Sequence, residues 1–264
     1  MGKRLAGIFW SLVFLAVPVL GVATFAVAPA YDIWLPKDVS EHGASIDSLF
    51  YFILVLTGVV FVVTEVLLFW FMWKYDASQQ QGATYIQGSH TLEVVWTIIP
   101  AATLLFIAIY QMNAWADVKM RRPAMQPTVE VVARQFEWRL RYPGRDGTLG
   151  TADDLFLVND LHLPVDEDVL IQLKSMDVLH SFFLPHVRIK QDAVPGMKIP
   201  VWFKARETGS YDIVCAELCG WGHYKMKGRV TFLPRADFDA WLERKYAEQG
   251  ATQPPPRTDD MAAN

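Results

Sequence analysis

The 264-residue sequence contains only two cysteines, Cys215 and Cys219, which lie four residues apart. It has no Cys-x-x-Cys-His motif, and this absence excludes a covalently attached c-type haem. It also lacks a Ser-His-Asp arrangement, a glycine-rich phosphate loop and a nucleic-acid-binding motif. The sequence therefore offers no support for hydrolytic, nucleotide-dependent or nucleic-acid-binding functions.

Charge is nearly absent from three long stretches. Ile8–Ala28 has no charged residue, Phe50–Trp73 has only Glu65, and Leu92–Trp115 has only Glu93. Each stretch is long enough to cross a bilayer, which takes roughly 20 residues. The sequence therefore predicts a membrane-anchored protein with two or three transmembrane helices. The deep position of Glu65 predicts that its carboxylate faces another helix or a partner subunit rather than lipid.

The first 30 residues allow two interpretations. Lys3 and Arg4 precede the apolar run, and small residues around Ala28 resemble a signal-peptide cleavage site. However, Pro29 disfavours cleavage after Ala28, and the run is longer than an ordinary signal core. Residues 1–30 are therefore either a signal peptide or an extra N-terminal transmembrane helix.

Both interpretations predict the same topology. Residues 46–117 are expected to form a transmembrane helical hairpin. Because Lys3 and Arg4 favour the inner side of the membrane, the chain from about Ala116 onward is expected on the outer side. We expect a multi-pass protein of a bacterial inner membrane whose domain at 118–234 faces the periplasm.

The outer domain at 118–234 consists of short apolar-alternating segments separated by Gly, Pro, Asp and Asn. This spacing is typical of an antiparallel β-sandwich or β-barrel. The expected strands are Thr128–Arg134, Glu137–Tyr142, Val169–Leu173, Ile199–Phe203, Tyr211–Val214 and Gly228–Leu233. In the final part, 235–264, an amphipathic helix is expected over Ala236–Glu248, followed by a disordered tail over Ala251–Asn264.

Acidic residues are concentrated just before the middle of this domain. Asp153–Asp168 carries six acids and no Lys or Arg, and the preceding segment from Asp146 faintly resembles a calcium-binding loop. The regular ligand spacing of an EF-hand is missing, so a solvated loop is the preferred interpretation.

Potential metal ligands gather in one loop and at one upstream position. The loop runs from Cys215 to Met226, and His180 lies 35 residues before Cys215. Thiolates and thioethers are soft ligands that suit copper. A disulfide and a closed zinc site are the alternatives, but zinc seldom takes a thioether. A single blue-copper ion uses one cysteine, so the ligand set favours two copper ions that share the thiolates.

The pattern Cys-x-Glu-x-Cys-x₃-His-x₂-Met, preceded by Asp177-Val-Leu-His180-Ser, resembles subunit II of haem–copper cytochrome c oxidases. The resemblance extends from about Ile46 to Leu233. It implies a membrane-anchored all-β protein in which transmembrane helices precede a cupredoxin-like Greek-key β-barrel. It also implies that the barrel holds a dinuclear copper centre, CuA.

The resemblance implies a role for each ligand. Cys215 and Cys219 would bridge the two coppers, and each copper would take one histidine. The remaining copper ligands would be His180, His223, Met226 and the backbone carbonyl of Glu217. The carboxylate of Glu217 would reach a magnesium ion shared with subunit I.

The resemblance also implies the reaction. The chain would accept electrons from a reduced cytochrome and pass them to haem in subunit I, where oxygen is reduced and protons are pumped. Glu93 would lie at the start of a proton path, although a carboxylate also simply favours a helix N-terminus. The alternatives are the CuA subunit of a nitric oxide reductase and a stand-alone copper-binding or assembly protein.

The place where electrons arrive departs from the family pattern. Family members commonly have Gln-Trp-x-Trp where this chain has Gln135-Phe136-Glu137-Trp138, so Phe136 and Trp138 are the candidate electron-accepting aromatics. From Ala116 onward the chain has 20 Lys and Arg against 21 Asp and Glu. This balance does not favour a strongly basic donor. It predicts a less basic cytochrome, either membrane-tethered or held in a supercomplex.

Overall fold

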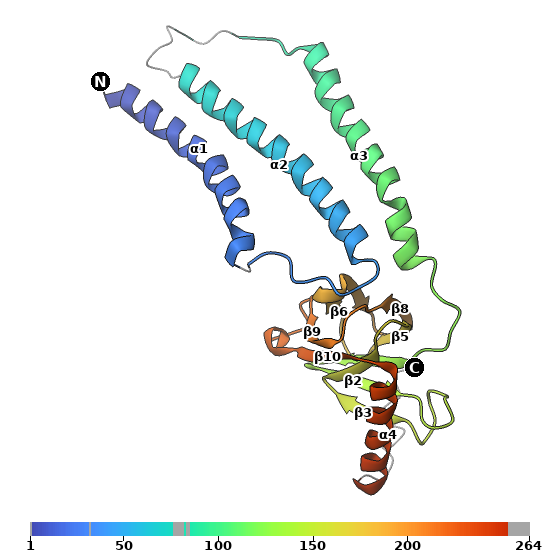
Figure 1. The fold of residues 1–264 in the computed structure, drawn as a ribbon. Helices are drawn as coiled ribbons and strands as arrows, with labels where there is room; N and C mark the ends of the chain where they lie inside the picture. The colour runs from blue at the N-terminus through green and yellow to red at the C-terminus, as the bar shows by residue number, and fades with distance from the viewer. Residues whose placement is uncertain (1, 32, 76–81, 83–84, 253–264) are drawn as a thin grey trace. The chain divides into compact units, whose positions relative to one another are not determined.

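The computed structural model describes residues 2–31, 33–75, 82 and 85–252 (Figure 1). The chain divides into two compact units. The first contains residues 1–36 and 47–112, and the second contains residues 37–46 and 113–264. The disordered tail predicted over Ala251–Asn264 overlaps the last helix of the second unit at residues 251 and 252. Residues 253–264 lie outside the described residues.

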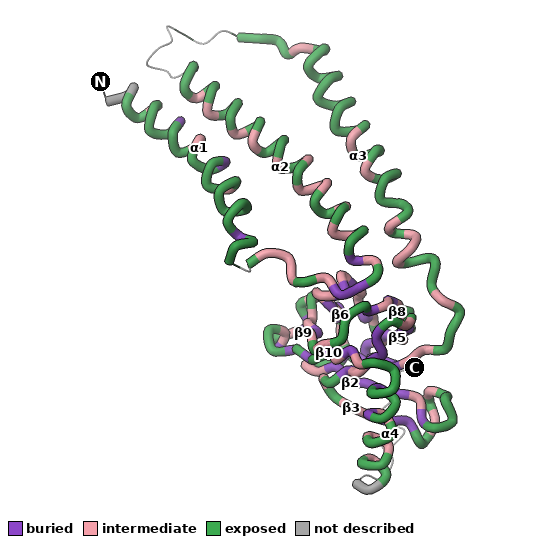
Figure 2. Tube along the Cα trace, in the orientation of Figure 1, coloured by how far each residue is buried: buried purple, intermediate pink, exposed green. Residues whose placement is uncertain are grey.

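The first unit is helical. Its elements are α1 (Gly2–Val27), the 3₁₀ turn η1 (Ala28–Tyr31), α2 (Gly43–Lys74) and α3 (His90–Lys119). All three α-helices are long and apolar enough to cross a membrane. The Ser89 hydroxyl accepts the Leu92 N–H at 3.5 Å at the start of α3, which is the position of a helix N-cap. Large apolar side chains on these helices are mostly exposed, whereas buried residues concentrate in the second unit (Figure 2).

The second unit is built from ten strands in two five-stranded sheets, ordered β3-β2-β1-β5-β8 and β4-β10-β9-β6-β7. The strands are β1 (Val129–Arg134), β2 (Glu137–Tyr142), β3 (Leu155–Val158), β4 (Asp160–Pro164), β5 (Asp168–Ser175), β6 (His180–Leu184), β7 (Ile189–Ala193), β8 (Ile199–Lys204), β9 (Gly209–Cys215) and β10 (Lys227–Leu233). This arrangement of helices followed by a cupredoxin-like domain confirms the predicted fold class.

The strand prediction needs two corrections. Four strands, β3, β4, β6 and β7, were not expected. β6 is buried along nearly its whole length, so it lacks the alternation that marks a half-exposed strand. The sheets are also not purely antiparallel, because β1 pairs with β5 and β4 pairs with β10 in parallel. Such pairings join distant segments and leave no local signal in the sequence.

The core forms where the two sheets face each other. In β2, Trp138, Leu140 and Tyr142 are buried and alternate with half-buried polar residues. The Trp138 ring meets Phe182 of β6 at 5.3 Å between centroids, and Phe203 of β8 meets Phe232 of β10 at 6.1 Å. Burying one such aromatic side chain stabilises a fold by about 1.5–3 kcal/mol. These contacts across the sheets make the barrel a rigid frame.

Helix α4 (Arg235–Thr252) closes one side of the barrel and is longer than the predicted 236–248. Trp241 stacks on His162 at 4.1 Å between ring centroids and meets Tyr142 edge-on at 5.5 Å. The Gln249 side chain donates to the Asp154 carbonyl at 2.7 Å and accepts the Phe156 N–H at 3.0 Å. These hydrogen bonds hold the last turns of α4 against the barrel and explain why the helix extends past the predicted end at Glu248.

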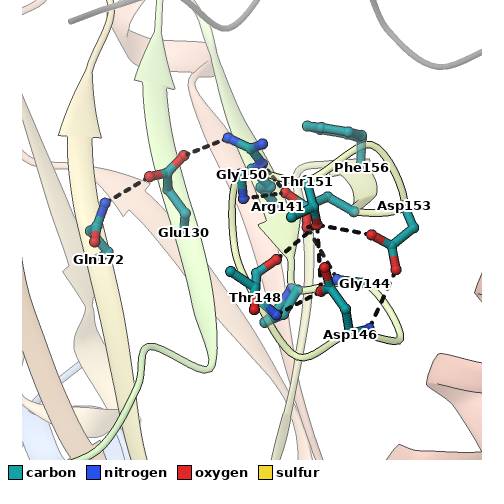
Figure 3. A network of polar contacts seen from close by, with 12 residues as sticks. Glu130, Arg141, Gly144, Asp146, Thr148, Gly150, Thr151, Asp153, Phe156 and Gln172 are labelled. Atoms are coloured by element: carbon teal, nitrogen blue, oxygen red, sulfur yellow. Dashed lines mark hydrogen bonds and ion pairs between the residues drawn. The ribbon is translucent and has the colours of Figure 1, made fainter.

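A network of polar contacts holds the acidic loop before β3, and it includes Arg141, Asp146 and Thr151 (Figure 3). Asp154 is fully buried, forms an ion pair with Arg141, and accepts the N–H groups of Gly144 at 3.1 Å and Gly150 at 2.7 Å. The prediction of a solvated loop is therefore wrong for Asp154. Arg141 on β2 supplies the compensating charge that lets this carboxylate leave water.

A short segment before α2 belongs to the barrel. The Val39 N–H donates to the His186 carbonyl at 2.9 Å, and the Val39 carbonyl accepts the Arg206 N–H at 2.7 Å. A β-bridge joins Ser40 to Ala205 just beyond β8, and the Val39 side chain is buried. The polar connector before α2 is thus partly an extra edge of the sheet.

Candidate metal centre

The ends of two neighbouring strands position the candidate ligands. His180 begins β6, Cys215 ends β9, and the two strands pair through Phe182 and Cys215. The loop after Cys215 returns to β10, and its ends are joined because the Cys215 N–H donates to the Met226 carbonyl at 3.2 Å. The sheet register therefore brings a residue 35 positions upstream next to the cysteine loop.

The sulfur and nitrogen atoms of this site lie within a few ångströms of one another. The two cysteine Sγ atoms are 3.9 Å apart, and neither cysteine is in a disulfide. Cys215 Sγ lies 3.9 Å from His180 Nδ1, and Cys219 Sγ lies 3.6 Å from His223 Nδ1. Met226 Sδ lies 3.8 Å from Cys219 Sγ. The Glu217 carbonyl oxygen lies 3.2 Å from Cys215 Sγ.

These positions fit a metal centre with shared thiolates. Ligand atoms of His180, Cys215 and Cys219 lie within 4.8 Å of one another and can hold a metal ion. His223 is not part of this three-residue cluster, although its Nδ1 is the imidazole atom close to Cys219. One imidazole thus lies beside each thiol. The Met226 thioether lies beside Cys219, and the Glu217 carbonyl lies beside Cys215. A single tetrahedral ion would instead need four donors around one point.

Asp177 orients the buried histidine. Its Oδ1 lies 2.8 Å from His180 Nε2, and its Oδ2 accepts the Gln135 N–H at 2.8 Å. Since Nε2 donates to the carboxylate, Nδ1 is the ring nitrogen that faces Cys215. It donates to the thiolate in the metal-free chain, and it can bind a metal once it loses its proton. Burial opposes ionisation of Asp177, yet the hydrogen bonds from Gln135 and His180 lower its pKa. The carboxylate is therefore charged and holds the orientation of the His180 ring.

The two thiols have very different acidities. Burial opposes the thiolate of Cys215, but hydrogen bonds from His180, from backbone groups and from His223 outweigh it and lower its pKa to about 6. Burial and the neighbouring Cys215 charge raise the pKa of Cys219 to about 12. Cys219 can therefore lose its proton readily only when a cation offsets the negative charge of Cys215. A metal ion bound by both sulfur atoms would supply that positive charge.

The structure separates the two candidate aromatics. Trp138 is fully buried, with its ring 6.3 Å from His180 and 5.3 Å from Phe182, so it offers no surface to a docking protein. Phe136 is half-buried in the turn between β1 and β2, and its ring lies 5.4 Å from that of Trp221. Glu93 lies in the first turn of α3, in the other unit of the chain.

Sequence reasoning missed two residues that support the site. The Gln135 side chain donates to the Cys219 carbonyl and so ties the β1–β2 turn to the ligand loop. Gln135 belongs to the family pattern around Phe136, but its contact with the ligand loop spans 84 residues and leaves no local signal in the sequence. The second residue is Trp221, which no sequence pattern singled out. Its position between the candidate ligands Cys219 and His223 is the sequence feature that could have indicated it.

Comparison with known proteins identifies the family to which the chain is similar. The sequence family described as cytochrome c oxidase subunit II, periplasmic domain, matches residues 128–231, and the transmembrane domain of the same subunit matches residues 28–114. The alternative cytochrome c oxidase subunit 2 of Bradyrhizobium diazoefficiens is 32% identical, with 74% of this chain and 78% of that protein covered. The cytochrome c oxidase subunit 2 of Thermostichus vulcanus is 27% identical, with 81% and 79% covered.

A solved structure also resembles the outer domain. The periplasmic domain of subunit II of cytochrome oxidase from Bradyrhizobium japonicum is 27% identical, and the match covers 48% of this chain and 97% of that one with a TM-score of 0.43. The two family matches together cover α2, most of α3 and nearly all of the barrel, and the loop from Cys215 to Met226 lies within the periplasmic-domain match. The chain therefore belongs to the cytochrome c oxidase subunit II family.

Proposed function

We propose that this chain is the subunit that receives electrons from a reduced cytochrome at a dinuclear CuA centre and passes them to haem in subunit I. The copper ligands would be His180, Cys215, Cys219, His223, Met226 and the Glu217 carbonyl. The observation that carries this proposal is the pair of thiols 3.9 Å apart, each beside its own imidazole nitrogen. Soft donors in this arrangement favour copper over zinc or a hard cation.

The chain's own residues keep the ligands in place. When bound, a dinuclear copper centre would supply one-electron redox chemistry in which no bond is made or broken. Asp177 holds the His180 ring, and Gln135 holds the Cys219 carbonyl. Gln135 lies in the turn between β1 and β2, and Asp177 lies in the turn between β5 and β6. Because the strands anchor both turns, the ligand positions change little between redox states, which keeps the reorganisation cost of electron transfer low.

Copper content and spectroscopy test the centre directly. The purified full-length chain loaded with copper is expected to bind two copper ions. Its oxidised form should give an EPR signal in which one unpaired electron is shared by two copper nuclei. Cys219→Ser should abolish this signal because a bridging thiolate is lost. A one-copper or zinc-loaded chain would contradict the proposal.

Glu217 connects the site to a partner. Its carbonyl oxygen faces Cys215, and we propose that its carboxylate binds a magnesium ion shared with subunit I. Carboxylate oxygens suit Mg²⁺, which commonly keeps other ligands from water or a partner. Glu217→Gln is expected to lower the magnesium content of the assembled oxidase while leaving two coppers per chain. Unchanged magnesium would contradict this part of the proposal.

Glu93 is proposed to start a proton path into subunit I. It lies in the first turn of α3 and is exposed in this chain, where a partner subunit or water can reach it. Glu93→Gln keeps the size of the side chain but removes its titration. Oxidase turnover is expected to fall about tenfold, equivalent to about 1.4 kcal/mol of barrier, with an unchanged copper spectrum. Full turnover by this variant would contradict the proposal.

Family membership favours oxygen as the terminal acceptor over nitric oxide and makes a stand-alone copper-binding role unnecessary. We further propose that the donor is a cytochrome less basic than typical soluble cytochrome c, membrane-tethered or held in a supercomplex, and that the chain resides in a bacterial inner membrane. Oxygen consumption by the purified complex, measured against nitric oxide consumption, tests the acceptor. Faster nitric oxide reduction would contradict it.

A further inference from the structure

We propose that Trp221 is the side chain through which a docked donor delivers electrons to the ligand loop. The inference rests on the proposed electron-transfer function and names the contact residue and the partner's surface. The partner it fits is a c-type cytochrome whose exposed haem edge is surrounded by apolar, weakly charged side chains.

Trp221 is an exposed aromatic inside the candidate metal-binding loop. Its exposed fraction is 78%, and it lies two residues after Cys219 and two residues before His223. Leu218, on the same loop, is 75% exposed. Apolar side chains this exposed beside a functional site are typical of a protein-binding surface. Tryptophan is also among the residues that most often dominate binding energy at such surfaces.

Two contacts hold the Trp221 ring in place. The ring meets Phe136 edge-on, with centroids 5.4 Å apart and planes inclined by 69°. Lys225 Nζ lies 4.5 Å from the Trp221 ring centroid, which is the geometry of a cation–π contact. An exposed ring that is already ordered loses little conformational freedom when a partner docks.

The Phe136 ring lies between Trp221 and the backbone of the ligand loop. A Cβ atom added to Gly222 would lie 2.5 Å from Phe136 Cδ2, and one added to Gly220 would lie 3.2 Å from the same ring. The Phe136 ring therefore packs directly on the backbone between Cys219 and His223. Trp221 and Phe136 together form an aromatic path from the protein surface to the ligand loop, whereas Phe136 alone is half-buried.

The charges around this path define the partner. The segment 134–139, Asp177 and the ligand loop contain three basic and three acidic side chains: Arg134, Arg139, Lys225, Glu137, Asp177 and Glu217. Such a balanced surface gives a strongly basic donor no electrostatic attraction. Apolar contact with Trp221 must then provide much of the affinity, which suits a donor with a near-neutral haem face.

Four variants of the full chain test the inference, and one of them, Trp221→Ala, removes both the ring and its apolar area. Trp221→Phe keeps an aromatic ring, Trp221→Leu keeps apolar area without a ring, and Tyr224→Leu is the matched control. Tyr224 is 74% exposed on the same loop, and no aromatic contact joins it to Phe136 in the described part of the chain. The probes are two reduced soluble c-type cytochromes, one with a near-neutral haem face and one strongly basic. Binding to the copper-free chain and reduction of the copper-loaded chain are measured separately.

Trp221→Leu is expected to slow reduction by the near-neutral cytochrome about tenfold, whereas Trp221→Phe and Tyr224→Leu stay within about threefold. Trp221→Ala, which removes the apolar area as well, is expected to weaken cytochrome binding to the copper-free chain about tenfold. Added salt should change the near-neutral donor's rate only weakly.

Each contrary result has a distinct meaning. Native-like reduction of Trp221→Leu would overturn the inference, as would equal slowing with dithionite, which would place Trp221 in support of the metal site. Faster reduction by the basic cytochrome, with a steep loss in salt, would overturn the assignment of the partner. If the native chain lacks the shared-electron EPR signal, the proposed function fails, while binding to the copper-free variants still tests the Trp221 contact.

Discussion

At the scale of single residues, the acidities of the two cysteines are set by their neighbours. Cys215 receives hydrogen bonds from His180 and from the backbone, which lower its pKa to about 6 despite burial. Cys219 is buried beside that negative charge, and its pKa is raised to about 12. At neutral pH the metal-free chain should therefore carry one thiolate and one thiol.

This difference predicts selective alkylation of the reduced, copper-free chain. Since a thiolate is the nucleophile, the reaction of Cys215 with iodoacetamide should rise through pH 6 and level off above it. Cys219 should stay largely unmodified at pH 8 because its pKa is raised to about 12. Peptide mass spectrometry measures both sites. Equal labelling of the two cysteines at pH 7 would contradict the prediction.

Asp154 shows how much one buried charge can matter. Asp154→Asn keeps the shape of the side chain but removes the charge that pairs with Arg141. The new amide has only one oxygen, so it cannot accept the N–H groups of both Gly144 and Gly150. The free energy of unfolding should fall by about 3 kcal/mol, measured by denaturant titration with tryptophan fluorescence. The control, Asp212→Asn, breaks an exposed ion pair with Arg229 and should cost less than about 1 kcal/mol. Equal effects would show that burial of Asp154 is unimportant.

At the scale of elements, the β1–β2 turn and the ligand loop support each other. The turn contributes the Phe136 ring and the Gln135 side chain, and the loop contributes glycines that leave space for the ring. Gly220 also has φ +134°, a backbone conformation that favours glycine. The geometry of the ligands thus depends on a hairpin about 80 residues away in sequence.

Gly222→Ala should disturb this packing. Its new Cβ would lie 2.5 Å from Phe136 Cδ2, so the loop or the ring must move. We expect about 1–3 kcal/mol of destabilisation and weaker copper binding, measured by denaturation and by copper competition. Gly250→Ala in α4 is the control, because no atom lies within 4 Å of its added Cβ. It should be neutral or stabilise by up to about 1 kcal/mol. A neutral Gly222→Ala would contradict the packing argument.

At the scale of the whole molecule, α2 and α3 predict that the chain crosses the membrane in both directions. Green fluorescent protein fused between the two helices should fluoresce, because it folds on the inner side. Alkaline phosphatase fused after the barrel should be active, because it needs the oxidising outer side. The reciprocal fusions should be inactive. Activity of the same reporter at both positions would contradict two spans.

Sequence alone determined the features that depend on neighbouring residues. Uncharged runs around Glu65 and Glu93 revealed the helices, because a bilayer tolerates few charges over a helix of that length. The spacing from Cys215 to Met226 predicted a soft-metal site, because one loop confines these potential donors whatever the rest of the chain does. Alternation in β2 also revealed a half-buried strand.

Only the tertiary structure decided how distant residues meet. The pairing of β6 with β9 places His180 beside Cys215, and a hydrogen bond to Asp177 selects the ring nitrogen that faces the thiol. Strand β2 buries Trp138, whereas the ligand loop leaves Trp221 exposed against Phe136. Non-local pairing carries no periodic signal along the chain. The sequence thus predicted the candidate ligands, whereas the fold determined their orientation and which aromatic reaches the surface.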